Sequence, residues 1–132
     1  MADADVPVEV RTAAALREAL AAIDSAELVG IDTEFMRVDT YYPKFCLLQI
    51  ATPTAVFCID PLADIDLTDL GACLAATRQP KLMHAARQDL EVLGPIGAGN
   101  PQPLIDTQLA AALLGLSDQI SYAAVVEQYC GV

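Results

Sequence analysis

An apolar run that ends in two acidic residues constrains this chain more than any other feature. Residues 28–31 have the apolar pattern of a buried strand, and Asp32 and Glu34 follow with one residue between them. Since alternate side chains of an extended chain point to the same face, the two carboxylates project together. Two like charges beside a buried strand are costly, and a divalent cation is the simplest compensation. The motif therefore predicts a metal site, the alternative being two side chains solvated beyond the strand end.

Length and composition predict one folded domain. The chain has 132 residues, of which 55 % are hydrophobic and 19 % charged, which favours a buried core over disorder. No apolar run reaches the ~18 residues of a membrane span, and the acidic residues 1–5 lack the basic start of a signal peptide. We therefore expect a cytoplasmic protein that does not contact a membrane. The cysteines lack the paired spacing of a zinc cluster and are expected to be buried free thiols, at Cys46, Cys58, Cys73 and Cys130.

The net charge bears on the choice of partner. Seven basic residues against 18 acidic ones give a net charge of -11. Taken alone, this charge argues against nucleic-acid binding, whose usual footprint is a basic patch. An enzyme that holds phosphates through metal ions still tolerates an acidic site.

The order of expected elements is that of a mixed α/β domain. We expect strands at 8–11, 28–34, 45–50, 55–59, 81–84 and 104–105. We expect helices at 13–23, 67–77, 85–93, 107–114 and 121–129, with candidate N-caps at Thr12, Asp66 and Asp106. Three consecutive strands joined by short turns predict an antiparallel meander, unlike a Rossmann-type site, whose first strand passes into a helix. The whole order predicts one sheet flanked by helices.

Six short motifs occur in a fixed order along the chain: Asp32–Phe35, Tyr41–Pro43, Leu48–Ile50, Ile59–Pro61, His84–Leu93 and Pro103–Gln108. Together they resemble the ribonuclease D family of DEDD 3′→5′ exonucleases, from about Thr12 to the last residue. The resemblance implies a ribonuclease H-like α/β fold, a mixed sheet with an antiparallel three-strand meander flanked by helices. It also implies that residues 1–132 form a single 3′–5′ exonuclease domain.

The activity that the resemblance implies is metal-dependent hydrolysis of RNA from its 3′ end. Asp32, Glu34 and Asp89 match the family's catalytic residues and metal ligands, for two Mg²⁺ or Mn²⁺ ions. Two such ions about 3.5–4 Å apart can activate a water and stabilise the leaving oxyanion, and carboxylates are suitable ligands. The implied partner is a single-stranded RNA 3′ end, with tRNA precursors as expected substrates.

Substrate contacts are expected around these carboxylates. The backbone from Thr33 to Met36 is predicted to lie against the terminal nucleotide, with Phe35 or Met36 near its base. His84 and Gln88, which precede Asp89, are further candidates for substrate binding.

Each polar or aromatic side residue also has a purely structural interpretation. A single histidine such as His84 is more often packed than catalytic, and Arg37 beyond a strand end is commonly solvated. Tyr41 and Tyr42 are of a type that stacks on bases, but a Tyr-Tyr-Pro turn that packs on the core is favoured. Asp106 is expected to cap a helix rather than to bind metal.

The chain departs from the family at the third motif, Tyr-x-x-x-Asp. Neither Tyr122 nor Tyr129 has an aspartate four residues further on. The sequence therefore predicts a C-terminally incomplete domain that lacks the fourth acidic ligand. We expect weaker metal binding and an exposed apolar surface, with a homodimer or poor solubility as the consequence.

Two alternatives accompany this interpretation. His84-x-x-x-x-Asp89 also fits the third motif of histidine-type DEDD enzymes, with a second ligand among Asp60, Asp64 and Asp66, although the flanking residues favour the ribonuclease D second motif. The other alternative is a catalytically incomplete module that binds nucleic acid or a protein. The retained carboxylates favour the exonuclease, because unpaired carboxylates cost stability.

Overall fold

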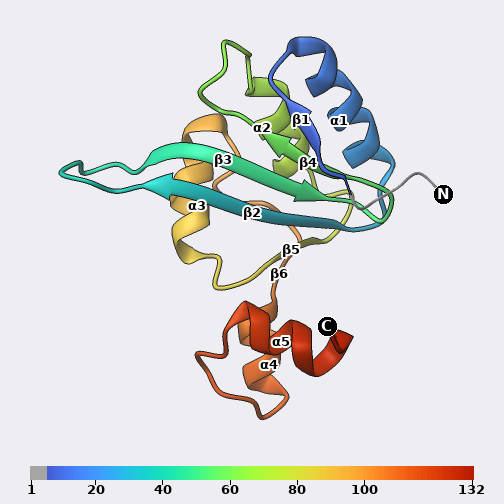
Figure 1. The fold of residues 1–132 in the computed structure, drawn as a ribbon, viewed down its shortest axis with the longest axis vertical. Coiled ribbons are helices and arrows are strands. Elements are labelled where there is room, and N and C mark those ends of the chain that lie inside the picture. Colours follow the sequence, from blue (N-terminus) through green and yellow to red (C-terminus); the bar gives the residue numbers. More distant parts are fainter. Residues whose placement is uncertain (1–5) are drawn as a thin grey trace.

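The computed structural model describes residues 6–132, so the expectation about a signal peptide in residues 1–5 lies outside the described residues. Its centre is a six-stranded mixed sheet (Figure 1). In spatial order the strands are β1 (Val8–Val10), β4 (Val56–Ile59), β3 (Lys44–Ala51), β2 (Val29–Met36), β5 (Lys81–Met83) and β6 (Leu104–Asp106). The expected strands are confirmed, with ends that differ by one or two residues.

The pairing of the strands confirms the predicted meander. β2, β3 and β4 pair antiparallel in sequence order, whereas β1 pairs parallel with β4, β5 with β2 and β6 with β5. β2 therefore has a neighbour on each side and lies in the interior of the sheet. Its register with β3 shifts between Glu34 and Phe35, where a bulge ends the regular pairing.

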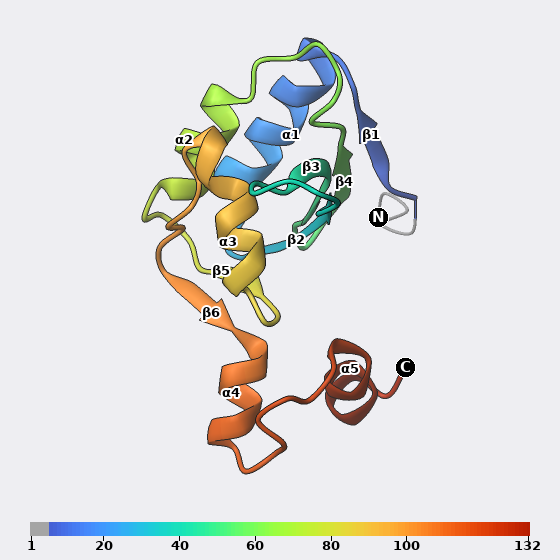
Figure 2. The same ribbon diagram turned by 90° about the vertical axis from the view of Figure 1, so that its left-hand side faces the viewer.

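The helices α1 (Ala13–Ser25), α2 (Thr68–Ala75) and α3 (Arg87–Leu93) cover one face of the sheet (Figure 2). Strand alternation explains which side chains meet them: Val29, Ile31 and Thr33 are buried, and both aliphatic residues belong to the core with residues of α1 and α2. Gly30, Asp32 and Glu34 alternate with them and point to the other face. This open face carries the predicted carboxylates.

Side-chain caps begin several helices where the sequence predicts them. Thr12 Oγ1 accepts from the N–H of Ala15 at 3.2 Å. Ser121, expected as the first residue of the last helix, is instead the N-cap of α5 (Tyr122–Cys130), and its Oγ accepts from the N–H of Ala124. The prediction of Asp66 as an N-cap is wrong: α2 begins one residue later than expected, so its N-cap is Leu67, and Asp66 Oδ1 accepts from the N–H of Thr68 just before the helix.

The start of α3 differs from the prediction. The helix begins at Arg87 instead of Ala85, because Ala85 has a φ of 54° and this left-handed conformation cannot continue a helix. Asp106 fixes the turn by accepting from the N–H groups of Ala85 and Ala86, at 3.0 and 2.9 Å. After Leu93 the chain continues into the 3₁₀ helix η1 (Gly94–Ile96), where the sequence predicts a simple break.

A lysine at the start of β5 is fully buried. Lys81 has 0 % of its surface exposed, and its Nζ donates to the carbonyl oxygens of Ala76 and Gln102. Burial lowers the pKa of Lys81, but the two acceptors compensate part of that cost. The side chain therefore ties the end of α2 to the loop before β6.

The last two helices, α4 (Thr107–Leu113) and α5, lie below the sheet in Figure 1. They expose apolar side chains, with Leu113 90 % and Leu114 71 % accessible. Within residues 6–132, none of the helices has the length and apolarity that crossing a bilayer requires. The four cysteines are free thiols, but only three are partly buried; the expectation of a buried thiol is wrong for Cys130, which is exposed.

Candidate active site

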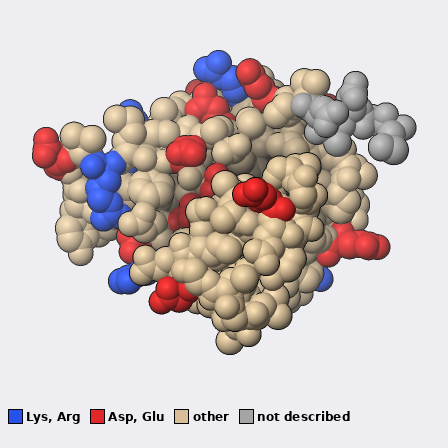
Figure 3. Space-filling view, turned by 60° about the horizontal axis from the view of Figure 1, so that its bottom comes forward, with Lys and Arg blue, Asp and Glu red and all other residues tan. Residues whose placement is uncertain are grey.

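Asp32 and Glu34 lie on the open face of β2, as predicted. In the register with β3, Asp32 lies opposite Gln49 and Glu34 opposite Leu47. The Gln49 amide Nε2 donates to Asp32 Oδ2 at 3.3 Å, so the neighbouring strand orients this carboxylate. Figure 3 shows acidic side chains within a hollow of this face.

Asp89 reaches β2 from the helix-covered side. It lies in the first turn of α3, and its Oδ1 accepts from the hydroxyl of Thr33 at 2.5 Å. Thr33 is 6 % exposed and stands between the two acidic residues of the strand. A bond between residues 56 positions apart thus fixes the α3 carboxylate beside the motif.

The three carboxylates interact electrostatically. Partial burial raises the pKa of Asp32, and the nearby charges of Asp89 and Glu34 raise it further. Within residues 6–132 none of the three forms an ion pair, and Arg37 is engaged instead with Glu91 at 3.0 Å. The site is therefore negatively charged without an internal counter-ion.

This donor set fits a hard divalent cation. Carboxylate and amide oxygens are its preferred ligands, and Mg²⁺ commonly binds through one or two carboxylates while it keeps several waters. No three His, Cys, Asp or Glu side chains in the described part of the chain are close enough to hold one ion together. Asp32 and Glu34 project from the open face of β2, and Asp89 is hydrogen-bonded to the hydroxyl of Thr33, the residue between them.

A cavity of about 500 Å³ opens beside Asp32 on the open face. Gly30 and Gln49 form part of its floor, and His84 and Tyr122 line it towards the end of the chain. The cavity brings β2, β5, α4 and α5 to one place next to the carboxylates.

Both ring nitrogens of His84 lie within hydrogen-bonding distance of other residues of the protein. Its Nδ1 lies 2.9 Å from Thr107 Oγ1, and its Nε2 lies 2.9 Å from the carbonyl oxygen of Ile120. The edge of its ring faces Tyr122, with 5.8 Å between the ring centroids. Its two ring nitrogens therefore link β5 to the start of α4 and to the segment before α5.

The other candidates for substrate binding occupy different environments. The Thr33 hydroxyl donates to Asp89, so only the backbone of Thr33 is a candidate for a substrate contact. Phe35 is partly buried, Met36 is 56 % exposed and Gln88 is exposed on α3. Their roles stay predictions.

The preferred interpretation of Tyr41 and Tyr42 is wrong. They do not pack on the core: their exposed fractions are 85 % and 76 %. The prediction for Asp106 is confirmed, since its carboxylate accepts from four backbone N–H groups. Burial alone would raise the pKa of Asp106, but these donors lower it below the ordinary value.

The alternative second ligands lie in other interactions. Asp60 pairs with Arg11 at 3.3 Å, and Asp66 holds the start of α2. Gln49 is a site residue that sequence reasoning missed, although it belongs to one of the six motifs. The antiparallel register of the meander, which places it opposite Asp32, is the signal that identifies it.

Comparisons with known proteins agree with this geometry. The model of a family described as 3′–5′ exonuclease matches residues 7–132. Ribonuclease D of Bartonella henselae is 41 % identical over 117 residues, which are 88 % of this chain and 29 % of that protein. Ribonuclease D of Escherichia coli is 38 % identical over 123 residues, which are 93 % of this chain and 33 % of that protein. The chain thus spans about a third of the length of these curated relatives.

Solved structures show the same fold. The crystal structure of Escherichia coli RNase D matches with a TM-score of 0.90 and 37 % identity, over 96 % of this chain and 34 % of that one. The catalytic core of RRP6 from Trypanosoma brucei matches with a TM-score of 0.84 and 26 % identity, over 96 % and 35 % of the two chains.

The mixed sheet, its antiparallel meander and the acidic pair on its interior strand define the class as a ribonuclease H-like nuclease fold. Within that class, the chain belongs to the 3′–5′ exonuclease family.

Proposed function

We propose that this chain carries the core of a metal-dependent 3′–5′ exoribonuclease of the ribonuclease D type. One observation carries the proposal: Asp32 and Glu34 share the open face of β2, and Asp89 is close enough to raise the pKa of Asp32. The likeness to Escherichia coli ribonuclease D over almost the whole chain supports the same activity.

In the proposed reaction, a water oxygen bonds to the last phosphorus of the RNA. The bond from that phosphorus to the 3′ oxygen of the preceding nucleotide breaks, and this oxygen takes up a proton. Asp32 and Glu34 would hold two Mg²⁺ or Mn²⁺ ions, which Asp89 would join directly or through water. When bound, such ions lower the pKa of a coordinated water and stabilise the leaving oxyanion.

The protein residues keep this arrangement in place. Gln49 orients Asp32 through its amide, and Thr33 holds Asp89 through its hydroxyl. The backbone from Thr33 to Met36, with the side chains of Phe35 and Met36, is proposed to meet the terminal nucleotide.

The proposed substrate is the single-stranded 3′ end of an RNA, such as a tRNA precursor. The RNase D structure from Escherichia coli is described as that of an exoribonuclease involved in structured RNA processing, and a Trypanosoma brucei RNase D is solved with the RNA U12. The proposal includes a cytoplasmic location, which the four free thiols support, since reduced thiols are typical of a reducing compartment.

The test is Mn²⁺-dependent shortening of a 5′-labelled single-stranded RNA. We expect the wild type to shorten the RNA stepwise, and the double variant Asp32→Ala/Glu34→Ala to leave it intact. The variant Glu9→Ala, at an exposed acidic position of β1, is the matched control and should retain activity. Shortening that persists in the double variant would contradict the proposed site.

A second candidate is a non-catalytic module that binds RNA or a protein through the same fold. The observation that favours it is that no three potential ligands within residues 6–132 gather around one point. RNA binding without shortening in Mg²⁺ or Mn²⁺ would favour this module over the exonuclease.

The predicted homodimer is tested separately. Exposed Leu113 and Leu114 supply apolar surface for it, whereas the net charge of -11 opposes association. Sedimentation velocity distinguishes the two, and a single monomeric species would contradict the dimer.

A further inference from the structure

The tip of the β2–β3 hairpin, residues 37–43, carries a pair of exposed aromatic rings. Tyr41 and Tyr42 are 85 % and 76 % accessible, and their rings meet edge to face with centroids 4.9 Å apart. Most of both rings therefore faces solvent. Aromatic faces of this kind stack on nucleobases without regard to base identity.

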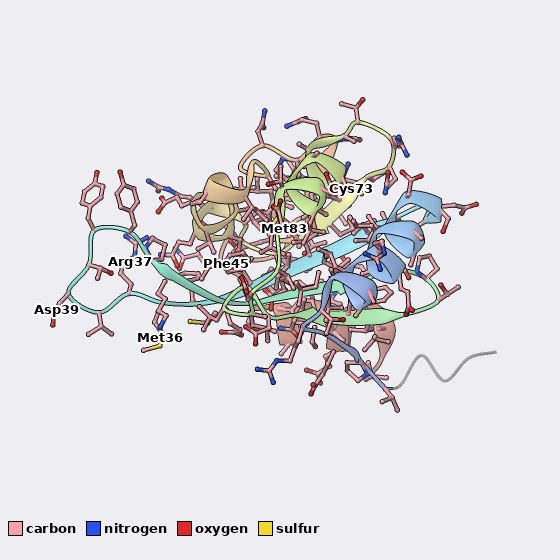
Figure 4. The ribbon with its side chains drawn as sticks, turned by 90° about the horizontal axis from the view of Figure 1, so that it is seen from above. Met36, Arg37, Asp39, Phe45, Cys73 and Met83 are labelled. Atoms are coloured by element: carbon pink, nitrogen blue, oxygen red, sulfur yellow. The ribbon has the colours of Figure 1, made fainter. Side chains whose placement is uncertain are left out.

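The hairpin tip has a defined position relative to the carboxylates. The Thr40 hydroxyl donates to the Tyr42 carbonyl at 2.7 Å, which closes the turn internally. At its base, Arg37 Nη2 lies 3.0 Å from Glu91 Oε2 on α3, the helix that carries Asp89. Figure 4 shows Met36, Arg37 and Asp39 along the hairpin, which projects beyond the sheet.

Basic side chains accompany the tyrosines although the chain as a whole is acidic. Arg37, the first residue of the tip, pairs with Glu91, and the exposed Lys44 follows the tip directly. Elsewhere, Arg11 and Arg78 pair with aspartates and Lys81 is buried, while Arg17 and Arg87 are exposed on helices α1 and α3. Figure 3 shows a group of basic side chains at the left-hand end of the molecule, where the hairpin lies in Figure 1.

The spacing suits a nucleic-acid strand that leaves the site. On β2, Met36 follows Glu34 by two residues and pairs with Lys44 of β3. Tyr42 precedes Lys44 by two residues and so lies further towards the tip of the hairpin. At ~3.3 Å per extended residue, Tyr42 is no more than about 13 Å beyond Glu34 along the hairpin. Nucleotides stacked at ~3.4 Å each cover this distance with about four units.

We propose that the hairpin tip is a second RNA contact, in which Tyr41 and Tyr42 stack on bases about four nucleotides upstream of the 3′ end and Lys44 meets the backbone phosphates. This inference rests on the proposed function, because it takes the 3′ end to lie at Asp32 and Glu34. It adds a contact outside the carboxylate site, which makes affinity depend on RNA length.

The experiment compares two RNAs by fluorescence anisotropy, with Ca²⁺ in place of Mn²⁺ so that binding is measured apart from cleavage. The probes are labelled oligouridylates of about twelve and about three nucleotides. We expect Tyr41→Ala/Tyr42→Ala to raise the Kd of the longer RNA at least about fivefold, which corresponds to the loss of one stacked base. The Kd of the shorter RNA should not change. The control Tyr129→Ala removes an exposed tyrosine of α5 and should change neither.

A second readout isolates the charge. Lys44→Ala should reduce the slope of log Kd against log salt by about 0.7 for the longer RNA, the value of one phosphate contact, whereas Arg17→Ala on α1 should not. Wild-type affinity of the tyrosine variant for the longer RNA would overturn the inference alone. A wild-type chain that binds neither RNA would overturn the proposed function and this inference together.

Discussion

Replacing Thr33 by valine tests whether the hydroxyl holds Asp89 in place. Valine has nearly the same shape, so Thr33→Val removes the bond to Asp89 Oδ1 without opening a cavity. A hydrogen bond to a charged group contributes about 1.5–3 kcal/mol to stability, and the partial exposure of Asp89 places this one at the lower end. For a chain of this size, we expect the unfolding temperature in EDTA to fall by about 5 °C.

The effect on metal binding is expected to be larger. Loss of a residue that orients a ligand typically lowers metal affinity about 10- to 100-fold, because the freed carboxylate samples other positions. A titration with Mn²⁺ followed by electron paramagnetic resonance measures the free ion directly. Thr33→Ser is the matched control, since it keeps the hydroxyl and loses only a methyl group. A Thr33→Val variant that binds Mn²⁺ as tightly as Thr33→Ser would refute the positioning role.

Three further predictions follow from single side chains. The pKa of Asp32 is raised in the folded protein, so the ionised carboxylate destabilises the fold at neutral pH, and this destabilisation disappears when the group is protonated below its ordinary pKa of 3.8. In thermal scans with EDTA we therefore expect Asp32→Asn to unfold at a higher temperature than wild type at neutral pH. The difference should be gone by about pH 3. Lys81→Met should lower the free energy of unfolding in urea by about 2–4 kcal/mol, because two carbonyl groups lose their charged donor; an unchanged midpoint would contradict this. Mass spectrometry after brief alkylation should find Cys130 modified first and Cys73 slowly, because Cys130 is exposed and burial raises the pKa of Cys73; the reverse order would count against the described exposures.

Local patterns in the sequence predict the local parts of this structure. Alternation along β2 places Asp32 and Glu34 on one face, and the short polar side chains of Thr12 and Asp106 cap helices, because each effect depends on residues only a few positions apart. The resemblance to the exonuclease family adds Asp89, which periodicity alone does not single out.

Features that depend on contacts between residues far apart in the chain cannot be predicted from local sequence patterns. The bond between Thr33 and Asp89 joins residues 56 positions apart, and Lys81 is buried because carbonyl groups of two separate loops accept from it. A Tyr-Tyr-Pro turn has the same local signal whether it folds onto the core or projects into solvent. The exposure of Tyr41 is therefore a property of the whole hairpin.

The attachment of α5 through the Ile120 carbonyl group and the ring contact between Tyr122 and His84 has a consequence for local unfolding. Ile120 O lies 2.9 Å from His84 Nε2 and accepts from Gln108 Nε2 at 3.1 Å, while α5 packs mainly on α4. β2, by contrast, pairs with β3 from Gly30 to Met36 and with β5 at Val29 and Gly30. We expect opening of this wall to cost less free energy than displacement of the carboxylates, which lie on a strand of the sheet. We therefore expect the cavity wall formed by α5 to open as a unit separate from the acidic floor on β2.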